Sequence, residues 1–309
     1  MSYEKIVLIT RKTRLEGLVE RFNTHDQARF YIEHNGGDFA AYEREHNSYY
    51  KSLSELRLQL SSILKLQVIE RQFLPNFIFS EKDIVVTVGI DGLVVNTAKY
   101  LDGQPLVAVN PDPQHIDGVL LPFNVSEAPH VVRRVLKGHE QARPVSMAEA
   151  RLNDGQVLLA FNDLFIGVRS HISARYSIRY QGIEENHSSS GIIVSTGAGA
   201  TGWMSSLFNM ATGIWGMFGN NQEGLKQPDL SWEAERLIFV VREPFASKTS
   251  QAGLVCGVIE PGSLLSIESQ AVEGGLIFSD GVETDFLAFN AGSLATVALS
   301  DKKTRLVVK

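Results

Sequence analysis

One acid lies between two glycines at the end of an apolar run. Residues 83–92 read Asp-Ile-Val-Val-Thr-Val-Gly-Ile-Asp-Gly, so that Asp91 stands between Ile90 and Gly92. The β-branched run predicts a buried strand, and the glycines predict a sharp turn at its end. In an open α/β sheet, ligands bind beyond the carboxyl ends of the strands. Asp91 is therefore a candidate for chemistry, on a loop whose backbone can approach a ligand closely.

A second glycine-rich turn follows another apolar run. Residues 190–203 read Ser-Gly-Ile-Ile-Val-Ser-Thr-Gly-Ala-Gly-Ala-Thr-Gly-Trp, which predicts a strand, a turn and a helix that begins near Thr201. Bare backbone N–H groups at a helix N-terminus form a ready anion site. The turn also matches the G-x-G-x-x-G spacing of dinucleotide-binding loops, although no acid ends a strand about 20 residues later. An anion site, a dinucleotide loop and a purely structural turn all remain open for Gly197, Gly199 and Gly202.

A polar pair interrupts a third apolar stretch. Residues 160–167 read Ala-Phe-Asn-Asp-Leu-Phe-Ile-Gly, which puts Asn162 and Asp163 between two apolar runs. One amide and one carboxylate can together recognise a polar ligand through hydrogen bonds. A β-turn or bulge is the other interpretation of this pair.

Composition and charge limit the classes of partner. The chain has 309 residues, of which 44% are hydrophobic and 21% charged, and its formal net charge is −6. These values are typical of a globular protein without a general affinity for nucleic acid or membrane surfaces. The single cysteine, Cys256, excludes an intramolecular disulfide and lies in an apolar stretch that predicts an inert, buried strand. We expect a cytoplasmic protein with neither a leader nor a membrane span.

Residues 1–138 alternate predicted strands with predicted helices. The longest helix is expected over residues 41–64, and the segment 11–14 after the first strand is expected to be a polar loop. This alternation is typical of a doubly wound α/β domain. The other expected helices cover 24–35, 93–101 and 126–136, and the expected strands cover 5–10, 67–70, 84–88 and 106–109.

Residues 139–309 show a different pattern. Short apolar stretches separated by turn signals predict a β-rich domain of the sandwich type. One helix, over about residues 201–211, interrupts the strands, and residues 218–231 are expected to form a long loop.

Taken in order, these motifs resemble those of the NAD kinase family. Gly89-Ile90-Asp91-Gly92 is similar to the family's Gly-Gly-Asp-Gly motif, and Asn162-Asp163 is similar to its Asn-Glu/Asp pair. Residues 190–203 resemble its Gly/Thr-rich segment, and Phe-Ser-Asp-Gly at 278–281 resembles its Asp-Gly turn. Trp203 and the run Val-Val-Arg-Glu-Pro-Phe-Ala at 240–246 are closest to the mitochondrial-type branch. The resemblance covers nearly the whole chain and implies an α/β domain, residues 1–138, followed by a β-sandwich domain, residues 139–309, whose C-terminal tail packs back on the first.

The resemblance also implies an activity. It implies transfer of a phosphoryl group from ATP, with Mg²⁺, to the 2′-hydroxyl of the adenosine ribose of NAD, giving NADP. In this scheme Asp91 is the base, and no protein side chains are expected as metal ligands. The implied partners are small-molecule nucleotides and further copies of the chain, in a homodimer or homotetramer. The residues implied for the donor are Gly89, Gly92, Lys12 and Arg14, and those implied for NAD are Asn162, Asp163, Thr196, Gly199, Thr201, Trp203 and Ser206.

Four positions depart from the family's pattern. Ile90 replaces the second glycine, where a left-handed backbone would cost a β-branched residue roughly 1–2 kcal/mol. Leu93 replaces a threonine, and Ala198 and Ala200 replace hydroxyl residues. An active NAD kinase and a catalytically impaired NAD(P)-binding regulator of the same fold are therefore both open. A lipid or sugar kinase of the related diacylglycerol kinase fold is a third reading, and ATP and polyphosphate both remain possible donors.

Overall fold

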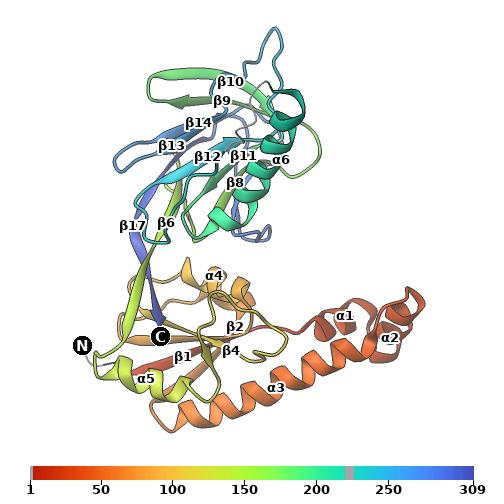
Figure 1. The fold of residues 1–309 in the computed structure, drawn as a ribbon, viewed down its shortest axis with the longest axis vertical. Helices are drawn as coiled ribbons and strands as arrows, with labels where there is room; N and C mark the ends of the chain where they lie inside the picture. Colours follow the sequence, from red (N-terminus) through yellow and green to blue (C-terminus); the bar gives the residue numbers. More distant parts are fainter. Residues whose placement is uncertain (1–2, 220–225) are drawn as a thin grey trace. The chain divides into compact units, whose positions relative to one another are not determined.

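A computed structural model shows two compact units. It describes residues 3–219 and 226–309. Unit 1 consists of residues 1–143 and 305–309, and unit 2 consists of residues 144–304. Two long strands, β6 (Gln141–Leu152) and β17 (Leu294–Val308), belong in part to each unit (Figure 1).

Unit 1 is built on a parallel sheet. Its strands follow the order β17, β4, β3, β1, β2, and β5 lies beside the end of β4. β3 and β4 are buried at every residue, as expected of strands covered on both faces. The C-terminal part of β17 joins this sheet, since Arg305 and Leu306 pair with the start of β4. The strands are β1 (Lys5–Thr10), β2 (Lys65–Glu70), β3 (Asp83–Val88), β4 (Pro105–Asn110) and β5 (Phe123–Asn124).

Helices cover both faces of this sheet. α3 (Phe39–Ser61) and α5 (Ala128–Leu136) share one core with β1, β3 and β4, through side chains such as Tyr49, Val132 and Val86. α4 (Asp91–Ala98) lies on the opposite face (Figure 1). The expected doubly wound α/β domain is therefore confirmed. The remaining helical segments are α1 (Arg14–Phe22), α2 (His25–His34) and the 3-10 helix η1 (Arg71–Asn76).

The expectation of a loop through Arg14 is wrong, because α1 begins there. Thr13 caps this helix: its side chain accepts from the backbone N–H of Glu16, and the Glu16 carboxylate accepts from the backbone N–H of Thr13. This reciprocal pair satisfies two donors that a helix start otherwise leaves free. α1 and α2 pack on the first turns of α3 through Leu15, Ala28 and Phe39.

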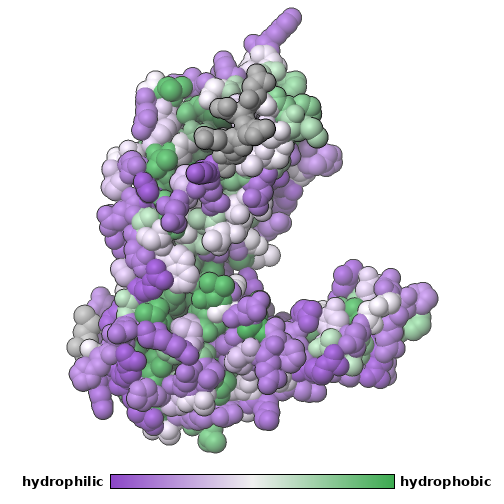
Figure 2. Space-filling view, in the orientation of Figure 1, coloured by the Kyte–Doolittle hydropathy of each residue, from purple (hydrophilic) through white to green (hydrophobic). Residues whose placement is uncertain are grey.

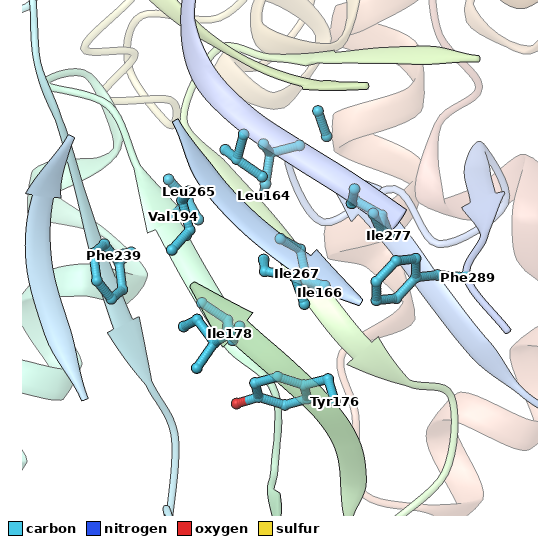
Figure 3. Packing of buried hydrophobic residues seen from close by; sticks show 14 of the residues in the cluster. Leu164, Ile166, Tyr176, Ile178, Val194, Phe239, Leu265, Ile267, Ile277 and Phe289 are labelled. Atoms are coloured by element: carbon cyan, nitrogen blue, oxygen red, sulfur yellow. The ribbon is translucent and has the colours of Figure 1, made fainter. Parts of the chain in front are cut away.

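Unit 2 is a β-sandwich, which confirms the expected class of the second domain. One sheet has the order β10, β9, β14, β17, with β6 beside β17 and β7 beside β6; the other has the order β13, β12, β11, β8, β15, β16. Figure 3 shows side chains from the two sheets facing one another, among them Ile166, Ile178 and Ile277. The strands not yet given are β7 (Val157–Ala160), β8 (Asp163–Val168), β9 (Ala174–Tyr180), β10 (Ile183–Ser189), β11 (Ile192–Ser195), β12 (Leu237–Val241), β13 (Cys256–Ile259), β14 (Leu265–Ser269), β15 (Gly275–Ser279) and β16 (Phe286–Ala288).

One helix, α6 (Trp203–Phe218), packs on the outer face of the second sheet through Met204. It is longer than expected and keeps several apolar side chains exposed, Met217 and Phe218 among them. Figure 2 shows hydrophobic surface over α6. Residues 220–225 of the expected loop lie outside the described residues, and residues 226–231 form neither helix nor strand. Across residues 3–219 and 226–309, no helix combines the length and apolarity needed to span a membrane.

The expected burial of Cys256 is wrong. This cysteine is exposed, because it starts β13, which is the edge strand of its sheet. An apolar run alone does not distinguish an edge strand from a central one.

Candidate functional site

The Gly89–Gly92 loop in unit 1 joins β3 to α4. Ile90 is the N-cap residue of α4 and has an extended backbone, with φ −110° and ψ 167°. The left-handed strain expected at this isoleucine is therefore absent, because the chain enters the helix directly. A Cβ on Gly89 would lie 3.0 Å from the Leu93 side chain, whereas a Cβ on Gly92 would meet no atom within 4 Å. Gly92 thus borders open space at the start of the helix.

Asp91 is the first residue of α4 and is half-buried. Its two carboxylate oxygens accept backbone hydrogen bonds, Oδ1 from Leu120 at 2.9 Å and Oδ2 from Val119 at 3.2 Å. An acid in the first turn of a helix is also stabilised by the helix dipole. Each carboxylate oxygen can accept a second hydrogen bond, so the group remains able to bind a ligand hydroxyl.

The loop that supplies these donors is itself held in shape. Asn110, the last residue of β4, donates from Nδ2 to the carbonyl of Ile116 at 2.8 Å and accepts from the N–H of Asp112 at 2.9 Å. Gly118 has φ +62°, and a Cβ on it would lie 2.9 Å from Asn110 Nδ2. The loop therefore presents Val119 and Leu120 to Asp91 in a fixed geometry.

A cavity of about 260 Å³ lies beside this loop, at the carboxyl ends of the unit 1 strands. Arg11 and Arg14 both border it, and both donate to the Glu45 carboxylate on α3. Burial opposes the ionisation of Glu45, but the hydrogen bonds from Arg14 and Arg11 outweigh it and lower the pKa of Glu45. The residues that line the cavity are Arg11, Arg14, Glu45, Tyr49, Ile90, Pro111, Asp112, His115 and Ile116.

Of the two cations expected at the donor phosphates, only Arg14 borders this cavity. Lys12 makes an ion pair with Glu20 of α1 at 2.6 Å, and Glu20 lines a separate pocket. Arg11 was not among the site residues expected from the sequence; its side chain is only 10% exposed and lies over the Tyr49 ring at 5.1 Å. Its position directly after the first strand was the available signal.

In unit 2, strand register brings three of the sequence motifs together. Ser195 at the end of β11 pairs with Asp163 at the start of β8, and Ser279 at the end of β15 pairs with Leu164. The Asn162–Asp163 pair, the turn after β11 and the Asp280 turn therefore meet at one end of the same sheet. The Gly89–Gly92 loop belongs to unit 1.

Asp280 organises this end of the sheet. It has φ +56°, and its carboxylate accepts the backbone N–H groups of Phe161 at 3.1 Å, Asn162 at 2.7 Å and Asp163 at 3.3 Å. The Asp-Gly turn was expected from the sequence, but Asp280 was not among the expected site residues. The Asp-Gly dipeptide indicated a tight turn, but nothing in the sequence showed which backbone it would bind.

The environment of Asp163 disfavours the charged form of its carboxyl. Its side chain is buried, and the residue is 8% exposed. Burial, and after it the negative charge of Asp280, raises the pKa of the Asp163 carboxyl to about 7. Within the described residues, no hydrogen bond reaches the side chain of Asp163 or that of its half-buried neighbour Asn162. Both polar groups are therefore available to a ligand.

The turn after β11 is closely packed. The Thr196 hydroxyl donates to the carbonyl of Phe161 at 2.6 Å and accepts the N–H of Gly199 at 3.2 Å. A Cβ on Gly197 would lie 1.9 Å from the Ser231 carbonyl oxygen, and one on Gly199 would lie 2.1 Å from the Asn162 carbonyl oxygen. These two glycines are required by the packing of backbone on backbone.

The residues expected after this turn are more accessible. Thr201 ends the short 3-10 helix η2 (Gly199–Thr201) and is exposed, as is Ser206 in α6. Trp203 starts α6, stacks on Phe165 with ring centroids 5.8 Å apart, and lies under the Arg242 guanidinium at 5.3 Å. Trp203 therefore anchors the helix start to the sheet.

The part of the chain that the structure describes contains no metal site formed by three or more His, Cys, Asp or Glu side chains. Mg²⁺ usually binds through one or two carboxylates together with substrate phosphates. A nucleotide-borne Mg²⁺ is compatible with these residues.

Comparison with known proteins shows relatives by structure alone. No model of a known protein family matches the chain, and no curated protein matches it by sequence. The structure is similar to yeast NADH kinase complexed with NADH, with a TM-score of 0.62 and 15% identity over 100% of this chain and 84% of that one. It is also similar to an Archaeoglobus fulgidus NAD kinase in complex with ATP, with a TM-score of 0.57 and 16% identity over 97% of this chain and 92% of that one. The protein therefore has the fold of NAD and NADH kinases.

Proposed function

We propose that the protein is a member of the NAD kinase family and transfers a phosphoryl group from ATP to the adenosine-ribose 2′-hydroxyl of NAD, giving NADP. The observation that carries this proposal is the Asp91 carboxylate, fixed by two backbone N–H groups at the carboxyl end of the sheet. The fold supports it, since the two similar structures are kinases that bind NADH and ATP.

In this proposal Asp91 acts as the general base. A ribose hydroxyl is a weak nucleophile at neutral pH, and a carboxylate that accepts its proton accelerates attack. The hydroxyl oxygen then bonds to the γ-phosphorus of ATP, the bond to the bridging oxygen breaks, and ADP leaves. The backbone N–H groups at the open helix start, at Asp91 and Gly92, would bind the phosphates, whereas the Gly89 N–H already donates to the Val109 carbonyl at 3.2 Å. Mg²⁺, carried by those phosphates, supplies charge neutralisation.

The unit 2 site would bind NAD. Asn162 and Asp163 offer an unused amide and an unused carboxylate, which suit the hydroxyls and amino group of an adenosine. Thr201, Trp203 and Ser206 lie at the start of α6, where the helix dipole favours an anionic pyrophosphate. Thr196 and Gly199 act indirectly in this scheme, because they hold the turn in shape.

The alternative is a regulator that binds NAD(P) without catalysis. It rests on the four departures from the family's pattern, but two of the four residues are buried and pack in the interior of the protein. Leu93 is 1% exposed beneath Gly89, and Ala200 is 5% exposed against the second sheet. Ile90 has an ordinary backbone. These departures leave Asp91 accessible, which favours the active kinase.

The test is a direct assay of the purified protein. Incubation with Mg-ATP and NAD, or NADH, is expected to yield NADP, or NADPH, which a chromatographic separation quantifies. If NAD binds by calorimetry and no product forms, the regulator replaces the kinase. If neither product nor binding appears, both proposals fall. Light scattering on the same sample tests the proposed homodimer or homotetramer.

A further inference from the structure

A separate pocket in unit 1 lies between α5, β5 and the residue that follows β17. Its volume is about 390 Å³, which is within the usual range of about 300–1,000 Å³ for small-molecule sites. None of the residues that line it borders the cavity beside Ile90. The function proposed above therefore leaves this pocket without a role.

The floor of the α5 pocket is apolar. Phe123 of β5 and Val131 of α5 line it and are 3% and 4% exposed, because both also belong to the core that α5 shares with the sheet. The edges of these two side chains offer apolar surface to a ligand. A bare inorganic ion would leave this surface and most of the volume unfilled.

The rim of the pocket carries two nitrogen donors from one face of α5. Arg134 donates from Nε and Nη2 to the carbonyl of His139, at 3.3 and 3.2 Å, and among the residues that the structure describes no acid pairs with its guanidinium. His130 is exposed, and within the same residues its ring has no hydrogen-bond partner. Because residues at i and i+4 of a helix are neighbours, both side chains can reach one group of a ligand.

Glu127 is the only acid among the described residues that line the pocket, and its oxygens are occupied. Oε2 accepts from the N–H of Asn124 at 2.9 Å, and Oε1 accepts from Lys309 at 3.1 Å. The hydrogen bond from Asn124, and after it the one from Lys309, holds the pKa of the Glu127 carboxyl below its usual range. Glu127 and Lys309 therefore balance one another, and Arg134 leaves the pocket positively charged.

We propose that the α5 pocket is a binding site for a small organic oxyanion, in which a carboxylate or phosphate group is attached to an apolar body. The unused edge of the Arg134 guanidinium suits either group, since its planar donors match two oxygens. His130 supplies a further donor, and Phe123 and Val131 pack against the apolar body. This site is independent of the proposed kinase function.

Calorimetric titration of the full-length protein with benzoate and with phenyl phosphate tests this inference. At least one of the two is expected to bind, at least fivefold more tightly than inorganic phosphate, and the tighter of them identifies the head group. Benzyl alcohol, which lacks the charge, should not bind. Arg134→Gln should weaken binding by about tenfold and His130→Gln by about threefold. Arg133→Gln is the matched control, because it removes the same charge from an exposed residue of α5 that does not line the pocket.

Glu127→Gln gives a result that a folding defect cannot imitate. It removes the negative charge, keeps an acceptor oxygen for the N–H of Asn124, and should tighten binding by about threefold. The melting temperature of each variant shows that it is folded.

Four outcomes overturn the inference. In the wild type, these are a lack of binding by both organic anions and binding of inorganic phosphate as tight as theirs. Among the variants, they are an affinity in Arg134→Gln no lower than that in Arg133→Gln, and a Glu127→Gln variant that binds no more tightly than the wild type. The assay for NADP formation is separate, so that either proposal can fail while the other stands.

Discussion

The two glycine-rich turns of the molecule differ in how much space surrounds their glycines. In unit 2, Gly197 and Gly199 are enclosed by backbone, and an added Cβ would lie 1.9 and 2.1 Å from carbonyl oxygens. In unit 1, Gly92 faces open space. The unit 2 turn is therefore fully packed, whereas the backbone of the unit 1 turn at Gly92 remains accessible to a ligand.

The acids of the two turns differ in the same way. Asp280 accepts three consecutive N–H groups of its own sheet end and so fixes the backbone there. Asp91 accepts two N–H groups from a separate loop and keeps lone pairs for a ligand. We therefore expect stability to depend mainly on the unit 2 turn and, under the proposed function, catalysis to depend mainly on the unit 1 turn.

Among the effects on stability, the largest is expected in unit 2. Gly199→Ala would press a Cβ against the Asn162 carbonyl and is expected to cost about 3 kcal/mol or more, at or above the upper end of ordinary overpacking. Gly92→Ala is the matched control and should change stability by less than about 1 kcal/mol, since alanine suits a helix. Urea unfolding measures both. Equal losses in the two variants would contradict the comparison.

The next effect concerns Asp280. Asp280→Ala leaves three backbone N–H groups without their acceptor, and each unpaired buried donor costs about 1–3 kcal/mol. Asp280→Asn keeps one acceptor oxygen and should lose clearly less. Chemical denaturation of both variants provides the measurement, and an alanine variant as stable as wild type would show that Asp280 does not hold this turn.

Asp163 predicts a pH dependence. Its folded-state pKa is raised, so the native state holds the proton between about pH 4 and pH 7, where the unfolded chain releases it. The stabilisation that the protonated Asp163 carboxyl gives the native state is therefore present at low pH and is lost as the pH rises through about 7. Between pH 5 and pH 8 the wild type should lose about 2–3 kcal/mol more than Asp163→Asn. Parallel pH profiles of unfolding free energy for the two proteins would rule this out.

The smallest effect is expected at Lys12. Because Lys12 pairs with Glu20 and lies outside the cavity lining, Lys12→Ala should change the KM for ATP less than twofold. Arg14→Ala, in the cavity wall, should raise it at least fivefold. Steady-state kinetics at varied ATP distinguishes the two. A larger effect at Lys12 than at Arg14 would place the donor elsewhere.

The sequence predicted the fold well where a pattern was local. The apolar run at 84–88 and the cap at Thr24 gave β3 and α2 nearly to the residue. The start of α1 was missed, although Thr13-Arg14-Leu15-Glu16 carries the capping-box pattern that would have predicted it. Cys256 was misplaced because its burial depends on which strand lies at the sheet edge, and only the pairing of strands decides that.

The candidate site was less predictable, because its geometry depends on contacts distant in sequence. The motifs made Asp91 and Asn162 candidates, but they gave no sign that residues 119–120 would hold Asp91 or that Asp280 would bind residues 161–163. Ile90 is a second example of a feature that the sequence alone did not predict. Its strain was inferred from residue type, whereas its backbone conformation is set by the entry into α4.

The central claim is that Asp91 is the base of an NAD kinase, and the turnover number of Asp91→Asn for NADP formation tests it most directly. Asparagine keeps one acceptor oxygen, enough for one of the two N–H groups of residues 119 and 120, and cannot take a proton. We predict that kcat falls by about 10²–10⁴-fold, the range for loss of a general base, while the affinity for NAD changes less than threefold. A variant that retains more than a tenth of the wild-type kcat would contradict the account.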